Sequence, residues 1–315
     1  MPDTPVAGPL QPGRSPGAAA PVPGDPVIRA RLQLGGRLRE LREQAGITGG
    51  KAAAAIGATC SKVYRIEAGQ VPVRDRDARD LAGLYEAAGL DADADELTSL
   101  AAQGRKHGWW DDYAKVIPPA ARHRLALEAA ATRVVAWEPE CVPVLLQTPA
   151  YAAAVTDPLS GHPLLERLSP PVHRHRQALL TARLSPRLWA VISEAALIRS
   201  PDGDPAVMAD QLAHLASLAA ERHICVQVLP LRDSSHLSCL GAFSILRFEL
   251  AAAVPCELPD IVAARSLASP PVTGQQDTDR AWQAFMAAAV HAITPEQTTR
   301  LLRQAVGDGG WTLQP

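Results

Sequence analysis

Residues 48–69 read TGGKAAAAIGATCSKVYRIEAG, and this stretch decides the fold of the N-terminal part of the chain. Thr48 and Thr59 each precede a run with helical spacing, where a threonine hydroxyl can accept a hydrogen bond from a first-turn amide. Gly57 lies between the two runs and supplies the backbone freedom that a sharp corner between helices requires. The pattern predicts two short helices, ending at Gly57 and Gly69 and joined by a tight turn.

The second of these helices has an apolar face and a polar face. Val63 and Ile66 are three residues apart, so we expect both to point into a small helical core. A short exposed helix with basic side chains suits insertion into a DNA major groove. Arg65 is placed to bind guanine, and Lys62 and Thr59 to bind phosphates. The residues expected to contact DNA are Thr59, Cys60, Ser61, Lys62, Tyr64, Arg65 and Arg74.

The same stretch resembles the Cro/phage-repressor-like (XRE) helix-turn-helix family. The matching residues are Leu38, Leu41, Arg42, Gly46, Thr48, Ala53, Ile56, Gly57, Ser61-Lys62-Val63, Arg65-Ile66-Glu67 and Gly69. The resemblance implies binding of double-stranded DNA, and it implies a structural ion pair between Arg42 and Glu67. Gly49, Gly50 and Cys60 depart from the family pattern, in which glutamine or glutamate is usual. The competing interpretation is an ordinary helical hairpin inside a larger domain.

Charge is distributed unevenly along the 315 residues, whose net charge is −2. Residues 31–85 carry ten basic and six acidic side chains, a net charge of +4. A local positive excess is what phosphate binding requires. Because this excess is modest, we expect one domain to bind DNA weakly and the protein to act as a homodimer.

Composition also favours a protein of the reducing cytoplasm. The N-terminal residues are rich in proline and glycine and lack the apolar segment of a signal peptide. No apolar run approaches the ~20 residues that a membrane helix needs, so no membrane contact is expected. The cysteines are odd in number and show no CxxC spacing, which argues against disulfides and a zinc site. They are Cys60, Cys141, Cys225, Cys239 and Cys256.

The chain divides into two expected domains. Residues 1–30 are predicted to be a disordered tail, 31–106 an all-α domain of five helices, 107–119 a linker and 309–315 a second tail. The first helix is expected from about Leu32 to Ala45, and Asp75 or Asp77 is expected to cap the fourth. Trp109 and Trp110 in the linker could form a stacking platform for a ligand or nucleic acid, but their acidic neighbours repel phosphate. We therefore expect them to anchor one domain against the other.

Residues 120–308 alternate between helical and strand patterns, which predicts an α+β domain with a small mixed sheet. A helix is expected over 122–136 and another around 208–218. Strands are expected over 188–193, 223–229, 242–248 and, more weakly, 260–264. Ile245 and Leu246 should point to opposite faces of the sheet, so both faces should be covered. Thr294, Pro295 and Gln297 give the start of a last helix.

The segment WEPECVPVLLQTPAYAAAV (137–155) resembles the signature of the uncharacterised DUF5753 domain. Further matches are Arg176-Gln177-Ala178, the run 192–197 and VQVLP (226–230). The resemblance implies a transcriptional regulator of high-GC actinobacteria, similar to WhiJ-like proteins, with a small DUF397-type protein as a possible partner. Val144 stands where the signature has glycine. Ala263-Ala264-Arg265 replaces a usual Tyr-x-Glu.

The family signature around 137–151, together with the scarcity of other concentrated polar positions, favours a ligand or partner pocket formed by Trp137, Leu146, Glu194 and His236. A small-molecule effector is the expected ligand. Glu194 and His236, with Ser234 and Ser235, are also the best catalytic candidates. However, no GxSxG, HExxH or P-loop motif is present, so we expect no catalytic residues, no cofactor and no metal.

The sequence therefore favours a DNA-binding transcriptional regulator whose second domain supplies dimerisation or sensing. Two alternatives remain open. One is an antitoxin-like protein that binds a small partner encoded beside it. The other is an enzyme whose C-terminal domain is the catalyst.

Overall fold

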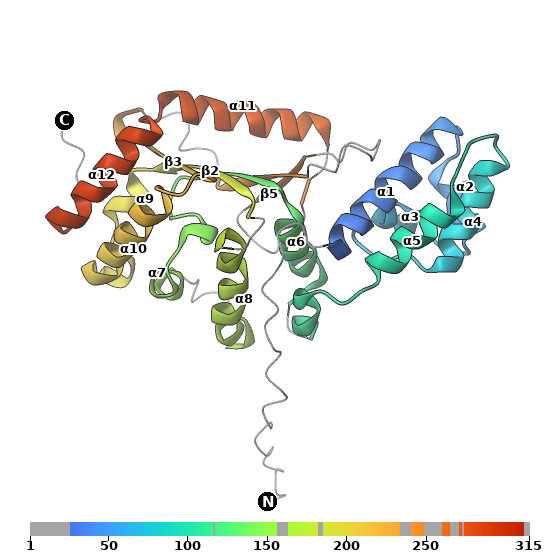
Figure 1. Ribbon diagram of the computed structural model, residues 1–315, viewed down its shortest axis with the longest axis horizontal. Helices are drawn as coiled ribbons and strands as arrows, with labels where there is room; N and C mark the ends of the chain where they lie inside the picture. Colours follow the sequence, from blue (N-terminus) through green and yellow to red (C-terminus); the bar gives the residue numbers. More distant parts are fainter. Residues whose placement is uncertain are drawn as a thin grey trace, which may run out of the picture.

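A computed structural model describes residues 26–115, 117–155, 163–181, 185–233, 241–248, 260–264, 271–272 and 274–311. A helical domain and a larger domain built on a β-sheet lie side by side (Figure 1). The expected fold class, an all-α helix-turn-helix domain followed by an α+β domain with a mixed sheet, is confirmed.

The N-terminal domain has five helices around one apolar cluster. Leu38, Leu41, Val63, Ile66 and Tyr85 are all buried in this cluster. The helical spacing of these residues is the reason why the sequence alone predicts the domain. The helices are α1 (Pro26–Gln44), α2 (Gly49–Ala55), α3 (Cys60–Glu67), α4 (Asp75–Glu86) and α5 (Ala94–Gly104).

The first helix begins earlier than the sequence predicts. It starts at Pro26, so the expected tail over residues 1–30 is five residues too long at its C-terminal end. Val27 and Ile28 are buried, and Ile28 packs in the core of the second domain together with Leu32. The extra helical turn therefore joins the two domains. Residues 1–25 lie outside the described residues.

The fourth helix is also not capped as expected. Its N-cap is Arg74, whose side chain makes no capping hydrogen bond. Asp75 instead pairs with Arg105, at 2.7 Å between Oδ1 and NH1. Asp77 pairs with Lys62, at 2.9 Å between Oδ2 and Nζ. Both carboxylates are thus used in tertiary contacts, which helix spacing does not reveal.

The second domain contains a five-stranded sheet with the order β3-β2-β1-β4-β5. β1 and β2, and β2 and β3, are parallel, whereas β4 runs antiparallel to β1 and β5. The four strands predicted from the sequence are all present. The strands are β1 (Arg133–Glu138), β2 (Arg187–Ser193), β3 (Ile224–Leu229), β4 (Phe243–Arg247) and β5 (Ile261–Ala264).

The central strand, β1, is missed by the sequence analysis. The helix expected over 122–136 ends at Ala130 in α6 (Pro119–Ala130), and Ala131 is already extended. Val134 and Val135 then lie in the strand with their side chains buried on opposite faces of the sheet. A short apolar run that is buried on both faces has no period of its own, so it cannot be separated from the end of an apolar helix.

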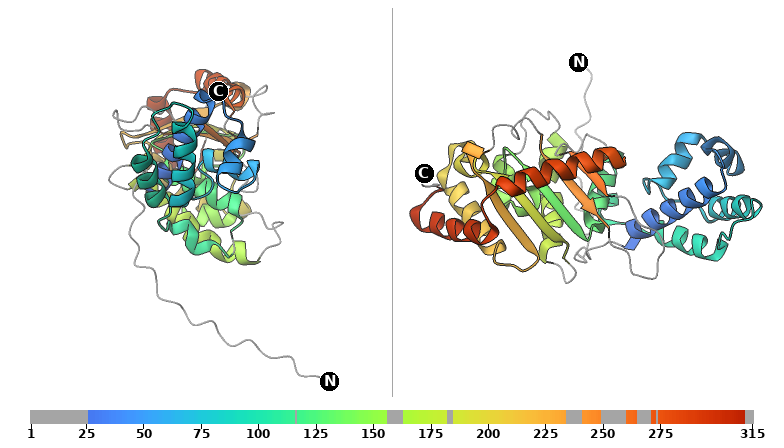
Figure 2. Two further views of the ribbon diagram at one scale, coloured as in Figure 1. Left: turned by 90° about the vertical axis from the view of Figure 1, so that its right-hand side faces the viewer. Right: turned by 90° about the horizontal axis from the view of Figure 1, so that it is seen from above.

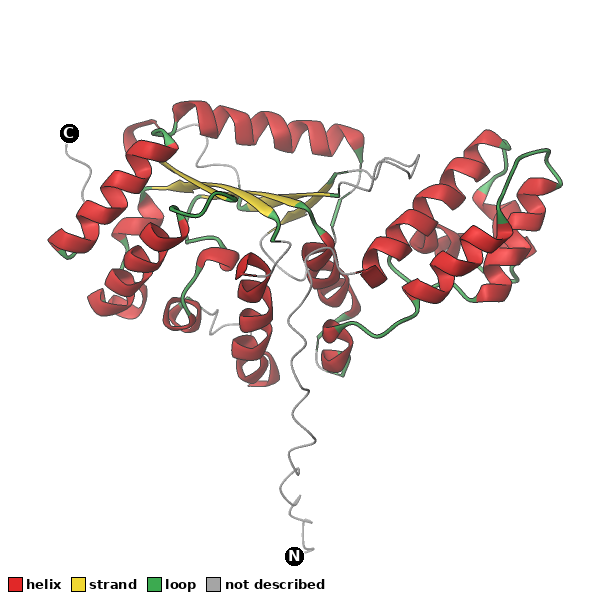
Figure 3. Cartoon of the chain, viewed as in Figure 1, coloured by secondary structure: helices red, strands yellow, loops and turns green. Residues whose placement is uncertain are grey.

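Helices cover both faces of the sheet (Figures 2 and 3). Ile245 packs in the cluster under α11 (Gln275–His291), and Leu246 packs in the larger cluster on the other face, which confirms the predicted orientation of this pair. The larger cluster is covered by α6, α7 (Pro149–Ala154), α8 (Pro163–Thr181), α10 (Pro205–Leu218) and α12 (Pro295–Asp308). The shorter helices are η1 (Trp109–Tyr113), η2 (Val144–Leu146), α9 (Ala195–Ile198), η4 (Pro201–Gly203) and η5 (Leu231–Asp233).

Two segments expected to lie outside the domains are packed into them. Within the linker, Trp110 is buried in the larger cluster and Trp109 stacks on His175, with 4.5 Å between the ring centroids. Within the expected C-terminal tail, Trp311 is buried, and its Nε1 donates to Oε1 of Glu194 at 3.2 Å. Large aromatic side chains anchor both segments because their burial removes much apolar area from water.

Candidate nucleic-acid interface

The corner between α2 and α3 is built by local hydrogen bonds. Thr48 Oγ1 accepts from the amide of Lys51, and Thr59 Oγ1 accepts from the amide of Lys62, each at 3.3 Å. Gly57 has a φ of 59°, a left-handed conformation that glycine adopts without strain. These contacts fix the angle at which α3 leaves the turn.

The outward face of α3 carries most of the residues predicted to contact DNA. Val63 and Ile66 are buried, so the helix has a fixed rotation about its axis. The exposed residues are Thr59, Cys60, Ser61, Tyr64 and Arg65. Ser61 and Arg65 are one turn apart and therefore lie on the same side of the helix. This face can present a hydroxyl and a guanidinium to base edges.

Lys62 does not lie free on this surface. Its ammonium group is 2.9 Å from Oδ2 of Asp77, whose side chain is only 5% exposed. Arg74 is far more exposed, and its Nε is 3.4 Å from the same carboxylate oxygen. Lys62 therefore ties α3 to α4. Of the two basic residues beside Asp77, Arg74 is the more accessible to solvent and phosphate.

Arg42 and Glu67 form the ion pair that the family resemblance implies. Nε and NH2 of Arg42 lie 2.6 and 2.9 Å from the two carboxylate oxygens of Glu67, and NH1 donates to the carbonyl of Ile47. Hydrogen bonding to Glu67 raises the pKa of Arg42 above its ordinary value. Burial, and then the charge of Glu67, raise the pKa of the neighbouring Tyr85 to about 12. The pair holds α1, the α2 entry and the end of α3 in one unit.

Gly49 has a packing role that the sequence does not reveal. A Cβ atom at this position would lie 2.7 Å from Oη of Tyr64, so the tyrosine ring rests directly on the start of α2. Gly50 has no such neighbour, because its nearest contacts would be at 3.8 and 3.9 Å. Tyr64, predicted to contact DNA, is thus also a bridge between α2 and α3. Asp77 and Gly49 are the two site residues that sequence reasoning missed, and neither has a local sequence signal.

The predicted pocket of the second domain is not assembled. Trp137 is buried on the α11 side of the sheet, whereas Leu146 is buried on the opposite side. Glu194 accepts hydrogen bonds from Trp311 and from the amide of Leu231, so its two oxygens hold the chain together. His236, with Ser234 and Ser235, lies outside the described residues. The β-sheet therefore separates Trp137 from Leu146, although the two residues are close in the sequence.

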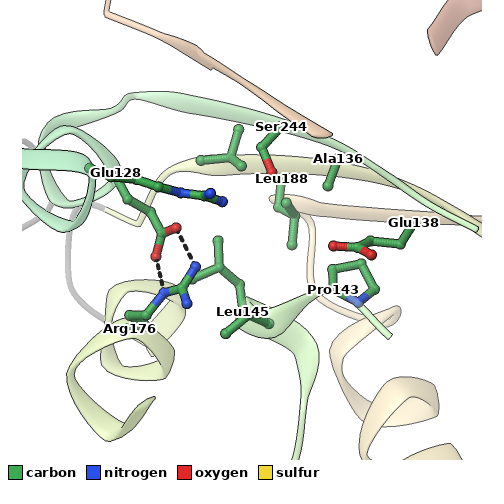
Figure 4. A pocket seen from close by; sticks show the side chains of 11 residues that line it. Glu128, Ala136, Glu138, Pro143, Leu145, Arg176, Leu188 and Ser244 are labelled. Carbon is green, nitrogen blue, oxygen red and sulfur yellow. Dashed lines mark hydrogen bonds and ion pairs between the residues drawn. The ribbon is translucent and has the colours of Figure 1, made fainter. Parts of the chain in front are cut away.

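The DUF5753-like signature instead surrounds a small charged cavity (Figure 4). Glu138, Pro143 and Leu145 line it together with a bidentate pair, in which Arg176 donates to Glu128 at 2.6 and 2.7 Å. Its volume is about 20 Å³, room for about one water molecule.

A second arginine of this cavity, Arg124, is buried too, and burial is the main reason why its pKa falls to about 10. Val144, which replaces the glycine of the signature, also lines the wall. The arrangement is that of a buried charged network that fixes α6 and α8 under the sheet.

Neither a metal-binding cluster nor a membrane-spanning helix is found in the described ranges. Within them, no group of three or more His, Cys, Asp or Glu side chains is arranged to hold a metal ion. Among the same residues, the helices are all too short or too polar to cross a bilayer.

The fold and the exposed face of α3 define a helix-turn-helix protein of the DNA-binding class. A helix-turn-helix domain model matches residues 33–97, and a model of the domain of unknown function DUF5753 matches residues 121–304. The second match covers more than half of the chain, so the chain belongs to the DUF5753 family. No curated protein and no solved structure matches it.

Proposed function

We propose that the protein is a sequence-specific transcriptional regulator of the XRE type, in which α3 reads an operator in the major groove. The observation that carries this proposal is the position of Arg65. It is exposed on the outward face of α3, one turn after Ser61, and the buried Val63 and Ile66 fix that face toward solvent. An exposed guanidinium on a rigid helix suits a bidentate contact with guanine O6 and N7.

In this proposal the exposed basic residues around α3 bind the DNA phosphates. Arg74 is 73% exposed and lies at the N-terminus of α4, beside the outward face. Lys62 contributes positive potential, although Asp77 already occupies its ammonium group. With a net charge of only +4 over residues 31–85, affinity depends on two domains that bind together. We infer a homodimer that recognises two half-sites about one helical turn apart.

In this proposal the second domain mediates dimerisation, senses a small molecule or binds a partner protein. Its charged cavity is too small in this conformation to hold a metabolite. The helix-turn-helix domain supports a regulator over an enzyme with a C-terminal active site. Binding of a small neighbour-encoded protein remains compatible with this domain and is tested by co-purification.

The deciding experiment is footprinting of the DNA upstream of the gene, followed by binding titrations with Arg65→Ala. This variant should lose about 1–3 kcal/mol on the footprinted site and become less selective at one base pair. Arg303→Ala, which removes a charge at an exposed position of α12, is the control and should bind DNA with the affinity of the parent protein. An equal loss of affinity on all DNA sequences would contradict the base-reading role of Arg65. The absence of any protected region in the footprint would contradict the proposed function.

A further inference from the structure

A pocket of about 420 Å³ lies at the junction of the two domains. One wall comes from the helix-turn-helix domain: Arg31 of α1, the loop between α3 and α4, and residues 105–107 after α5. The other wall comes from η1 and from Arg122 and His123 of α6. Figure 1 shows α1 and α6 beside each other at this junction. The volume lies within the ~300–1,000 Å³ of small-molecule sites.

The wall of this interdomain pocket is strongly basic. It contains four arginine and lysine side chains but only one carboxylate, that of Asp111. The basic side chains are Arg31, Arg105, Lys106 and Arg122. Arg105 is held by Asp75, which fixes its guanidinium at the rim. Arg31 also has a partner, because its Nε donates to the carbonyl oxygen of Gly104. The four basic side chains line a half-enclosed space, where attraction for an anion is stronger than in open water.

Arg122 is the best-placed group for such an anion. Its Nε is buried and has no hydrogen-bond partner within the described residues. Its NH1 reaches Asp111 at only 3.5 Å, the limit of a hydrogen bond. A buried guanidinium N–H without an acceptor is unfavourable. The side chain is 24% exposed, so a small movement toward an oxyanion in the pocket would supply the missing acceptor.

His123, the neighbour of Arg122, lines the same pocket. Burial, and then the positive charge of Arg31, lower the pKa of His123 to about 4, so its imidazole is neutral near pH 7. His123 therefore adds no charge to the wall, and the positive charge of the pocket comes from its arginine and lysine side chains. The pocket combines one guanidinium N–H without an acceptor with an excess of basic over acidic side chains.

We propose that the interdomain pocket binds a small molecule that carries a phosphate group, and that its occupation changes the affinity for operator DNA. Guanidinium groups bind phosphate through paired, charge-assisted hydrogen bonds. The pocket is larger than one phosphate, so the ligand has an additional organic part or a second phosphate. Because both domains form the walls, a bound ligand favours one arrangement of the domains over others. The coupling to DNA rests on the proposed function, whereas ligand binding does not.

The test uses inorganic pyrophosphate as the probe and the full chain as the protein. Calorimetry should show one site per chain. Arg122→Gln and, separately, Lys106→Gln should weaken binding by about tenfold or more, because each removes a charged contact. Arg303→Gln removes the same charge from α12, far from the pocket, and should leave binding unchanged. Weaker binding of citrate than of pyrophosphate supports a phosphate site, whereas equal binding of citrate overturns the assignment of a phosphate ligand.

The second arm titrates the footprinted operator with and without pyrophosphate. A shift in DNA affinity that disappears in Lys106→Gln supports the coupling, and by linkage DNA must shift the pyrophosphate affinity by the same factor. Absence of pyrophosphate binding, or binding that survives both substitutions, overturns the site. Binding that leaves operator affinity unchanged overturns the coupling alone. If both substitutions weaken DNA binding when no pyrophosphate is present, the pocket holds a DNA backbone phosphate, which overturns the small-ligand proposal.

Discussion

Arg42 and Glu67 form a two-point ion pair between α1 and the last residue of α3, with N–O distances of 2.6 and 2.9 Å. Their side chains are only 12% and 5% exposed. The Tyr64 ring lies 6.0 Å from the guanidinium carbon, so the pair also supports the residue that bridges α2 and α3. A buried pair of this kind sets the position of the recognition helix relative to the rest of the domain.

Arg42→Ala should therefore destabilise the N-terminal domain by about 3 kcal/mol or more, because it leaves the carboxylate of Glu67 buried without a partner. The measurement is the free energy of unfolding in urea. Arg39→Ala, which breaks an exposed pair with Glu43 on the same helix, is the matched control and should cost less than about 1 kcal/mol. Similar costs for the two variants would mean that packing alone holds α3 in place.

Lys62 and Arg65 should behave differently although they are three residues apart. Lys62→Met should lower the free energy of unfolding by roughly 1–3 kcal/mol, because the buried carboxylate of Asp77 loses its closest cation. Arg65→Met should leave stability within about 0.5 kcal/mol of the parent, since Arg65 is exposed. Thermal unfolding and DNA titration on the same variants separate the two roles. If Lys62→Met is as stable as the parent protein, the result would favour the sequence-based prediction that Lys62 binds a phosphate.

The two glycines at the start of α2 should also differ. Gly50→Ala should raise the stability of the domain by up to about 1 kcal/mol, because alanine is the better helix former and the added Cβ has room. Lys51→Glu should add to this, because Lys51 occupies the N3 position after the Thr48 cap, where a glutamate completes a capping box.

Gly49→Ala is the contrasting variant for this helix. It brings a Cβ to 2.7 Å from the Tyr64 hydroxyl and should cancel the helix gain by displacing the ring. Melting temperatures of the three single variants check both statements. Equal gains from Gly49→Ala and Gly50→Ala would show that Tyr64 moves away without cost.

Acid should destabilise the second domain through two histidines of its α6 and α8 helices. Burial is the largest cause that lowers the pKa of His123 and of His173 to about 4, against an ordinary value of 6.5. The unfolded chain binds these protons between pH 6.5 and 4 and the folded chain does not, so stability is fully present above pH 6.5. It then falls as pH decreases through this window.

Urea midpoints measured from pH 7 to pH 4.5 should show this loss. His173→Gln, which removes one such proton, should reduce the slope of the unfolding free energy by up to about 1.4 kcal/mol per pH unit. His291→Gln, at the exposed end of α11, is the control. A slope that does not change in His173→Gln would assign the acid sensitivity to other groups.

The sequence by itself determined the elements whose signals are local. Threonine caps, a glycine at the turn and apolar residues at helical spacing were sufficient for α2 and α3, and period-two alternation was sufficient for β3. Cys60, Ser61, Tyr64 and Arg65 are exposed on the outward face of α3 as expected, because helix geometry decides which side chains share a face, whereas Lys62 turns to Asp77. The mixed sheet followed from the same kind of pattern in the four flanking strands.

Only the tertiary structure decided the contacts between distant segments. Asp77 meets Lys62, Tyr64 covers Gly49, and Trp311 reaches Glu194 across 117 residues. The central strand β1 and the separation of Trp137 from Leu146 belong to the same class, because burial on two faces and the side of a sheet are properties of the packed chain. Side-chain spacing along a sequence reports the period of one element, whereas the choice of partner depends on which elements pack together.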